Sequence, residues 1–160
     1  EEVFEGTNGI CISVYENMKP YKQTLHLIPK ILVVGVGCKK GTPAERIKEK
    51  IKKVLAQNHI SEKSICMLAS IDLKAEEDGL IRTARELGAE FVTYSAEELQ
   101  KVKGDFTESA FVASVTGVSN VCERSAVLGS DIGVLICPKT AEDGVTVALA
   151  VKEYMIDFTI

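Results

Sequence analysis

A glycine-rich segment at residues 35–42, with the sequence Gly-Val-Gly-Cys-Lys-Lys-Gly-Thr, has the composition of an anion-binding loop. Apolar residues 31–34 precede it and an amphipathic stretch, residues 43–57, follows it, so we expect it to join a strand to a helix. The first N–H groups of a helix are unpaired and lie at the positive end of its dipole, which favours a bound anion. The residues expected to bind that anion are Gly35, Gly37, Cys38, Lys39, Lys40, Gly41 and Thr42.

The start of the expected helix supports this interpretation. Thr42 is a good N-cap, Pro43 suits the first helical position, and Glu45 completes a capping box. A tight strand-to-helix turn also uses glycine for steric reasons alone, so a purely structural role stays open. The spacing Gly-x-Gly-x-x-x-Gly matches neither the dinucleotide-binding pattern nor the P-loop. Asp72 nevertheless lies about where a ribose-binding acid would, which keeps nucleotide binding as an alternative.

Two further groups of polar residues follow predicted strand ends. Asp72, Lys74, Glu76 and Glu77 lie where a second strand gives way to a helix. In an open α/β sheet, ligands lie beyond the carboxyl ends of the strands, so we expect this group to share a crevice with the glycine-rich segment. Glu123 follows Gly117 and falls in the first turn of another helix, where the dipole favours a carboxylate and capping is the alternative role.

The bulk composition excludes several classes of protein. A net charge of −4 and a pI near 5.3 argue against nucleic acid or an acidic membrane as a general partner. The five cysteines are odd in number and form no Cys-x-x-Cys pair, which fits neither a disulfide framework nor a metal site and indicates a reducing, cytoplasmic setting. Because the chain lacks an initiator Met, we expect it to be part of a longer protein.

The order of the predicted elements indicates an α/β fold. Helices that alternate with short buried strands predict a three-layer α/β/α sandwich with a mixed sheet. A short β-hairpin, with strands at residues 9–15 and 24–28, is expected before it. The later strands are expected at residues 31–34, 65–69, 91–94, 133–137 and 145–151, and the helices at residues 43–57, 76–87, 95 onward and 120–128. The turn residues 142–144 join the last two strands into a closing hairpin, which makes the sheet mixed. Residues 95–98 predict a capping box, and Ser119 or Asn120 is expected to cap the last helix. Residues 109–115 fit a strand or a helix. We divide the chain into residues 1–29, the end of a preceding region or a linker hairpin, and residues 30–160, the α/β domain.

Five motifs, taken in order, resemble one known family. They are G-V-G-C-K-K-G-T, S-I-D-L-K-A-E-E-D-G-L, T-G-V-S-N-V-C-E-R-S-A-V-L, P-K and V-T-V-A-L-A. In this order and at this spacing they resemble the C-terminal domain of the cobalamin biosynthesis protein CbiG, which the stand-alone protein CobE shares. The resemblance covers about residues 27–151. One departure is Asp78, where a proline is common; it is an expected surface helix position.

The resemblance implies a role in the anaerobic, cobalt-early route to cobalamin. There CbiG is the cobalt-precorrin-5A hydrolase, which opens a δ-lactone on the macrocycle and releases acetaldehyde. The substrate carries the cobalt, so the family implies no separate cofactor and no metal site in the protein. It also implies that residues 109–115 are helical. The family pattern falls on Gly35, Gly37, Cys38, Lys39, Gly41, Thr42, Lys74, Glu77, Gly79, Gly117, Glu123, Lys139 and Thr146.

The family's reaction gives these residues hypothetical roles. Lactone opening needs a base to activate water and a positive group to stabilise the oxyanion. We expect Glu77 or Glu123 to be the base, and Lys74 or Lys139 to stabilise negative charge. The glycine-rich segment, Asp72, Gly117, Lys139 and Thr146 are expected to bind the substrate. The alternative is a non-catalytic domain that binds the corrinoid or docks another cobalamin-pathway enzyme. The sequence makes no prediction of oligomeric state.

Overall fold

A computed structural model describes residues 7–106 and 119–155 of the chain. The residue range 109–115 and Gly117, both part of the sequence predictions, lie outside the described residues. Within the described part, no helix is long and apolar enough to cross a membrane.

The centre of the fold is a mixed five-stranded sheet in the order β5-β4-β3-β7-β6. Three strands run parallel: β3 (Leu32–Cys38), β4 (Ile65–Ile71) and β5 (Glu90–Tyr94). The last two, β6 (Val134–Glu142) and β7 (Val145–Val151), form an antiparallel hairpin, and β7 pairs antiparallel with β3. The predicted mixed sheet and its closing hairpin are therefore confirmed.

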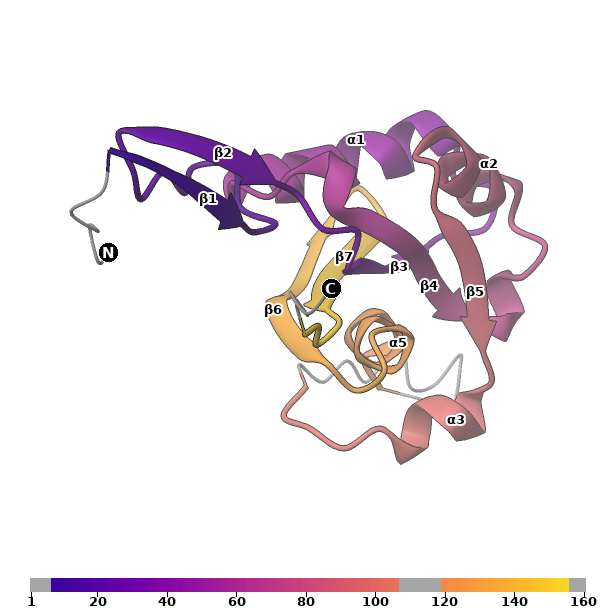
Figure 1. Cartoon of the computed structure of the whole chain (residues 1–160). Coiled ribbons are helices and arrows are strands. Elements are labelled where there is room, and N and C mark those ends of the chain that lie inside the picture. Colours follow the sequence, from indigo (N-terminus) through magenta and orange to yellow (C-terminus); the bar gives the residue numbers. More distant parts are fainter. Residues whose placement is uncertain (1–6, 107–118, 156–160) are drawn as a thin grey trace.

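Helices cover both faces of this sheet (Figure 1). On one face lie α1 (Ala44–Gln57) and α2 (Asp78–Glu86), which also pack against each other. On the other lies α5 (Val121–Gly129), against β3, β4 and β7, with α3 (Ala96–Lys101) beside it. Two short 3₁₀ turns, η1 (Glu62–Ser64) and η2 (Asp72–Lys74), flank β4. This is the predicted three-layer α/β/α sandwich.

Strand β3 lies at the middle of the core because both of its faces are covered. Val34 and Val36 are fully buried against the side chains of α1, which include Ile47 and Ile51. On the opposite face the backbone of α5 approaches the strand directly at Gly35. A Cβ at Gly35 would lie 1.8 Å from the carbonyl oxygen of Cys122, so only glycine allows this contact.

The two N-terminal strands correct one prediction. The strands themselves are present as β1 (Asn8–Ile12) and β2 (Gln23–Leu27), but they pair in parallel, so the expected hairpin is wrong. The reason lies in the connection between them. Val14 is buried in the main core and Tyr15 forms an antiparallel bridge with Ile60. The chain therefore crosses the main domain after β1 and returns to begin β2 at the far end.

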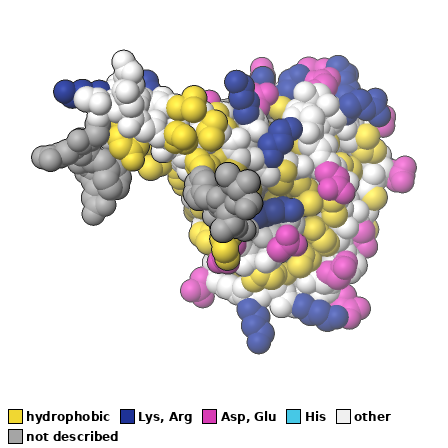
Figure 2. Space-filling model, viewed as in Figure 1, with side chains coloured by type: hydrophobic (Ala, Val, Ile, Leu, Met, Phe, Trp, Pro, Cys, Tyr) yellow, Lys and Arg dark blue, Asp and Glu magenta, His cyan; other side chains and the backbone are white. Residues whose placement is uncertain are grey.

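One face of this small sheet is apolar and exposed. Ile10 pairs with Leu25 in the register, and their exposed fractions are 58% and 59%. Leu27, which pairs with Ile12, is also exposed. Figure 2 shows hydrophobic side chains along these two strands, which extend away from the sandwich. On the other face the ring of Tyr21 covers Gly9.

Candidate functional site

One edge of the central sheet collects most of the predicted site residues. The carboxyl ends of β3, β4 and β6 lie here with the start of β7, since Cys38 pairs with Val145 and Val145 with Glu142. The β6–β7 turn contacts the segment after β3 directly: the Lys39 N–H donates a hydrogen bond to the Gly144 carbonyl oxygen at 3.2 Å. We call this region the carboxyl edge.

The glycine-rich segment is divided differently from the prediction. Strand β3 continues through Cys38, so Gly35, Gly37 and Cys38 are strand residues and only residues 39–43 form the loop. The two strand glycines make room for neighbours: a Cβ on Gly37 would lie 2.5 Å from Thr146 Oγ1. Thr146 Oγ1 in turn lies 3.4 Å from the Gly37 carbonyl oxygen.

The predicted capping box at Thr42 is wrong. Helix α1 begins at Ala44 with Pro43 as its N-cap, and no side chain caps it. The Thr42 hydroxyl instead donates to the Lys39 carbonyl oxygen at 2.7 Å, which closes the loop on itself. Gly41 has a φ of +74°, so a left-handed residue makes the turn between them. The box predicted at residues 95–98, by contrast, is confirmed at α3.

Glu77 joins the loop to the neighbouring segment. Its Oε1 accepts a hydrogen bond from the Gly41 N–H at 2.7 Å, and its Oε2 lies 3.6 Å from Lys74 Nζ. The two backbones also approach closely at Gly79, where an added Cβ would lie only 2.1 Å from the Thr42 carbonyl oxygen. The β3–α1 loop and the start of α2 are thus held together by one carboxylate and one close approach.

Cys38 lies beside this junction. Burial raises the pKa of its half-buried thiol; the charge of Lys74 lowers it to a lesser degree, and the charge of Glu77 raises it further. The thiol is therefore less acidic than a free cysteine and stays protonated at neutral pH. These influences also place Cys38, Lys74 and Glu77 in one neighbourhood, as the sequence predicted for the two groups.

Glu123 occupies a different environment from Glu77. It lies in the first turn of α5 and its exposed fraction is 1%. Its Oε1 accepts the backbone N–H of Lys139 at 2.6 Å, and its Oε2 accepts Asn120 Nδ2 at 2.5 Å. Asn120 is the N-cap of α5 in a left-handed conformation, and its Oδ1 accepts the Glu123 N–H at 3.3 Å. The predicted capping position is confirmed, and the carboxylate bridges α5 to β6.

The thiol of Cys122 is also enclosed at this helix start. Burial raises the pKa of Cys122 to about 12, and a hydrogen bond with Thr146 partly opposes that rise. Thr146 therefore contacts both α5 and β3. It fills a packing position between elements as well as lying near the carboxyl edge.

Most of the remaining predicted residues lie on the surface of the same edge, and Lys139 lies three residues before the end of β6. Lys39, Lys40 and Asp72 are exposed, and Lys139 is partly exposed. The aliphatic part of the Lys39 side chain packs over Gly144: a Cβ added to Gly144 would lie 3.1 Å from Lys39 Cδ. The turn at Gly144 is predicted from the sequence, but its contact with the glycine-rich segment is not. That contact depends on the pairing of β3 with β7, which no local sequence pattern indicates.

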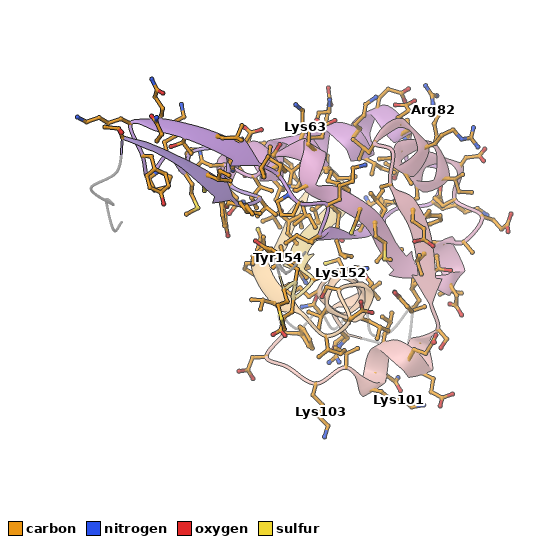
Figure 3. All side chains as sticks on the ribbon, viewed as in Figure 1. Lys63, Arg82, Lys101, Lys103, Lys152 and Tyr154 are labelled. Carbon is orange, nitrogen blue, oxygen red and sulfur yellow. The ribbon has the colours of Figure 1, made fainter. Side chains whose placement is uncertain are left out.

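A polar groove of about 530 Å³ opens next to the loop, between the starts of α1 and α2. Its lining includes Gly41 and Thr42 of the loop, three acidic residues and two arginines of α2: Glu45, Glu77, Asp78, Arg82 and Arg85. Arg82 projects from α2 at the outer surface (Figure 3), where it pairs with Glu45 and Glu86. No group of three or more potential metal ligands occurs among the described residues. The groove is therefore polar with charges of both signs, whereas the exposed Lys39 and Lys40 make the adjacent edge suited to an anionic ligand.

Comparisons with known proteins agree with this geometry. Cobalt-precorrin-5A hydrolase of Priestia megaterium is 38% identical over 126 residues, which cover 79% of this chain and 33% of that protein. Protein CobE of Sinorhizobium sp. is 31% identical over 121 residues, covering 74% of this chain and 79% of CobE. The chain thus spans about a third of the first relative and most of the second.

Solved structures and family models give the same result. The crystal structure of CobE, a protein from the cobalamin (vitamin B12) biosynthetic pathway, superimposes with a TM-score of 0.71 at 30% identity. That likeness covers 78% of this chain and 92% of the CobE chain. The model of the family described as Cobalamin synthesis G C-terminus matches residues 32–150, from the start of β3 to β7. The chain belongs to the Cobalamin synthesis G C-terminus family.

Proposed function

We propose that this chain is the corrinoid-binding part of a cobalt-precorrin-5A hydrolase, and that the carboxyl edge holds the substrate. One observation carries the proposal: Lys39 and Lys40 lie at this edge, Lys139 lies three residues before the end of β6, and within residues 7–106 and 119–155 none of them forms an ion pair. Corrin precursors carry several acetate and propionate carboxylates. Ammonium groups bind carboxylates through charge-assisted hydrogen bonds, which are stronger than neutral ones.

Hydrolysis at the same edge would use Glu77 and Lys74. Glu77 lines the groove, so a water molecule has access to it, and the ammonium of Lys74 lies 3.6 Å from its second oxygen. In this proposal the Glu77 carboxylate takes a proton from water as the water oxygen attacks the lactone carbonyl carbon. Lys74 stabilises the oxyanion, the ring C–O bond breaks, and the leaving oxygen is protonated. Acetaldehyde leaves in a second step: the freed hydroxyl on the methylated bridge carbon loses its proton and becomes the aldehyde C=O. The C–C bond that joins this carbon to the macrocycle breaks, and its electron pair stays on the macrocycle, which is then protonated.

The free thiols support a proposed cellular setting. All five cysteines are free, which supports a reducing compartment, and we place the protein in the cytoplasm. Cobalt enters the site with the substrate, so the proposal requires no resident metal.

A second candidate is a binding domain without hydrolytic activity of its own. The observation that favours it is length: the chain spans 33% of the Priestia megaterium hydrolase but 79% of CobE. In that case the rest of a longer hydrolase would supply the catalytic groups. Binding of the corrinoid is common to both candidates, whereas acetaldehyde release by this chain distinguishes them.

The experiment measures binding and turnover separately. Binding of cobalt-precorrin-5A is followed by the visible absorbance of the macrocycle, and acetaldehyde by a coupled reduction. The double variant Lys39→Gln/Lys40→Gln should weaken binding about tenfold or more, because one charge-assisted hydrogen bond contributes about 1.5 kcal/mol. Glu77→Gln should retain binding and lose acetaldehyde release, since the amide oxygen still accepts the Gly41 N–H.

Lys63→Gln is the matched control. Lys63 is an exposed lysine in η1, at the opposite edge of the sheet (Figure 3), so its loss should not change the dissociation constant. Equal affinity for the double variant and this control would refute the proposed binding edge. Binding by the chain without acetaldehyde would favour the second candidate, and normal acetaldehyde release by Glu77→Gln would remove Glu77 as the base.

A further inference from the structure

Strand β6 is irregular near its middle, before it reaches the carboxyl edge at Glu142. Cys137 pairs with Leu149 and Thr140 pairs with Val147, so β6 has one more residue than β7 between these pairs. This is a β-bulge, which leaves backbone groups outside the ladder and redirects a side chain. Pro138 lies inside the bulge and has no N–H to donate. The N–H of Lys139 is therefore the backbone donor that must find a partner elsewhere.

Glu123 supplies that partner. The Lys139 N–H donates to Glu123 Oε1 at 2.6 Å, which ties the bulge to the first turn of α5. A carboxylate with an exposed fraction of 1% is stable only when hydrogen bonds compensate for the lost hydration. Asn120 adds a donor to the second oxygen, and its left-handed backbone (φ 59°) places that side chain over the helix start. The bulge, Glu123 and Asn120 form one connected unit.

This arrangement argues against direct proton transfer by Glu123. A general base must reach the water or the substrate proton within hydrogen-bond distance. Glu123 is enclosed by α5 and the β6 bulge, whereas Glu77 lines a groove open to solvent. Within this unit the charged side chain that reaches solvent is that of Lys139, which is partly exposed and whose backbone N–H Glu123 accepts.

We propose that Glu123 is a positioning residue: by accepting the Lys139 N–H it fixes the β6 bulge, so that the Lys139 ammonium meets a substrate carboxylate at the carboxyl edge. This inference rests on the proposed corrinoid-binding function. Glu123 acts on binding through Lys139 and makes no contact with the reacting atoms. Its contribution should therefore disappear when the Lys139 ammonium is removed.

A double-variant cycle tests this dependence. Lys139→Gln keeps the backbone N–H and removes the ammonium, and should weaken cobalt-precorrin-5A binding about tenfold. Glu123→Gln should also weaken binding, by about three- to tenfold. Both Glu123 oxygens accept from donors, the Lys139 N–H and Asn120 Nδ2, so the NH₂ group of glutamine must face one of these donors and the bulge is held less firmly. The pair together should bind no more weakly than Lys139→Gln alone, since both changes remove the same contact. Glu123→Gln combined with Lys39→Gln should show the two losses multiplied.

Different results separate the alternatives. Multiplied losses for Glu123→Gln with Lys139→Gln would overturn the inference and indicate a general structural role. Unchanged binding with lost turnover in Glu123→Gln would also overturn it, in favour of a catalytic role. If Lys139→Gln itself binds normally, that part of the proposed binding edge fails, which is a different result from failure of the cycle.

A second variant guards against loss of folding. Asn120→Gly keeps the left-handed backbone and removes one donor to Glu123, so the fold is disturbed less. It should show a smaller loss of affinity with the same dependence on Lys139. Amide hydrogen exchange gives a readout without substrate: the Lys139 amide should exchange faster in this variant, and an unchanged rate would contradict the proposed unit.

Discussion

Substituting Gly79 by alanine tests the junction between the β3–α1 loop and α2. The added Cβ would lie 2.1 Å from the Thr42 carbonyl oxygen and 3.1 Å from Ile47 Cδ1. Ordinary contact begins near 3.4 Å, so α2 and the loop must separate by about 1.3 Å. A shift of that size breaks the 2.7 Å hydrogen bond between Gly41 N and Glu77 Oε1.

The expected magnitude follows from three contributions. Overpacking costs about 1–3 kcal/mol, and the lost hydrogen bond to a carboxylate about 1.5 kcal/mol. Alanine in place of glycine in a helix recovers about 0.5–1 kcal/mol. We expect a net loss of about 1.5–4 kcal/mol in the free energy of unfolding. For a chain of this size that lowers Tm by about 3–16 °C. Corrinoid binding should weaken as well, because the loop that carries Lys39 and Lys40 moves.

The assay combines thermal unfolding by circular dichroism with corrinoid binding below Tm. Gly88→Ala is the matched control, because a Cβ there meets no atom within 4 Å and only the positive φ of 63° is strained. That control should lose about 1 kcal/mol of stability and bind normally. The reasoning is refuted if Gly79→Ala unfolds at the wild-type temperature and binds with wild-type affinity, since the close approach would then not restrict the loop.

The other predictions concern single residues. Burial raises the pKa of Cys122 from about 9 in the unfolded chain to about 12 in the folded protein. The unfolded state therefore loses the thiol proton at a lower pH than the folded state does. The free energy of unfolding should fall as the pH rises from 9 to 12. Denaturant titrations of Cys122→Ala should show a shallower fall, and an equally steep one would contradict this. The raised pKa of Cys38 predicts slow alkylation by iodoacetamide at pH 7.5, compared by mass spectrometry with a free thiol. Ser95→Ala removes the cap of α3 and should cost about 1 kcal/mol, seen as a Tm lower by about 2–4 °C; no change would mean that α3 is held by packing alone.

The sequence predicts the layers of this fold well because buried strands and amphipathic helices leave strong periodic patterns. The apolar run of β3 and the helical spacing of α1 are both local signals. The Asn120 cap and the residues 95–98 box are also local, and both are present. The edge at which the site residues gather follows from the parallel order of the strands.

The predictions that fail depend on contacts between distant segments. Gly35 and Gly37 have the residue type of a loop but belong to β3. Glycine is required there because a Cβ would clash with the backbone of α5 at Gly35 and with Thr146 at Gly37. Thr42 has the sequence of a cap but bonds to Lys39 instead. The direction of β2 is set by the bridge that Tyr15 makes with Ile60, which no nearby residue indicates.

The two candidate carboxylates show the same limit at the site. Glu77 and Glu123 share a residue type and a position near a helix start, so the sequence treats them as equivalent bases. The structure separates them by environment: Glu77 lines an open groove and Glu123 is enclosed. Glu77 accepts the Gly41 N–H and Glu123 accepts the Lys139 N–H. Both are tertiary contacts between separate elements, so no local sequence pattern predicts them.

The pairing of β3 with β7 has a consequence for synthesis of the protein. The central strand, Leu32–Cys38, leaves the ribosome long before its neighbour Val145–Val151. The hydrogen bond between the Lys39 N–H and the Gly144 carbonyl oxygen, which completes the carboxyl edge, forms only after both segments are synthesised. Until then a nascent chain exposes one side of an apolar strand, and closing so long a loop is slow. Ribosome-bound chains that stop before residue 145 should therefore be sensitive to protease and dependent on chaperones, and the binding edge should mature last.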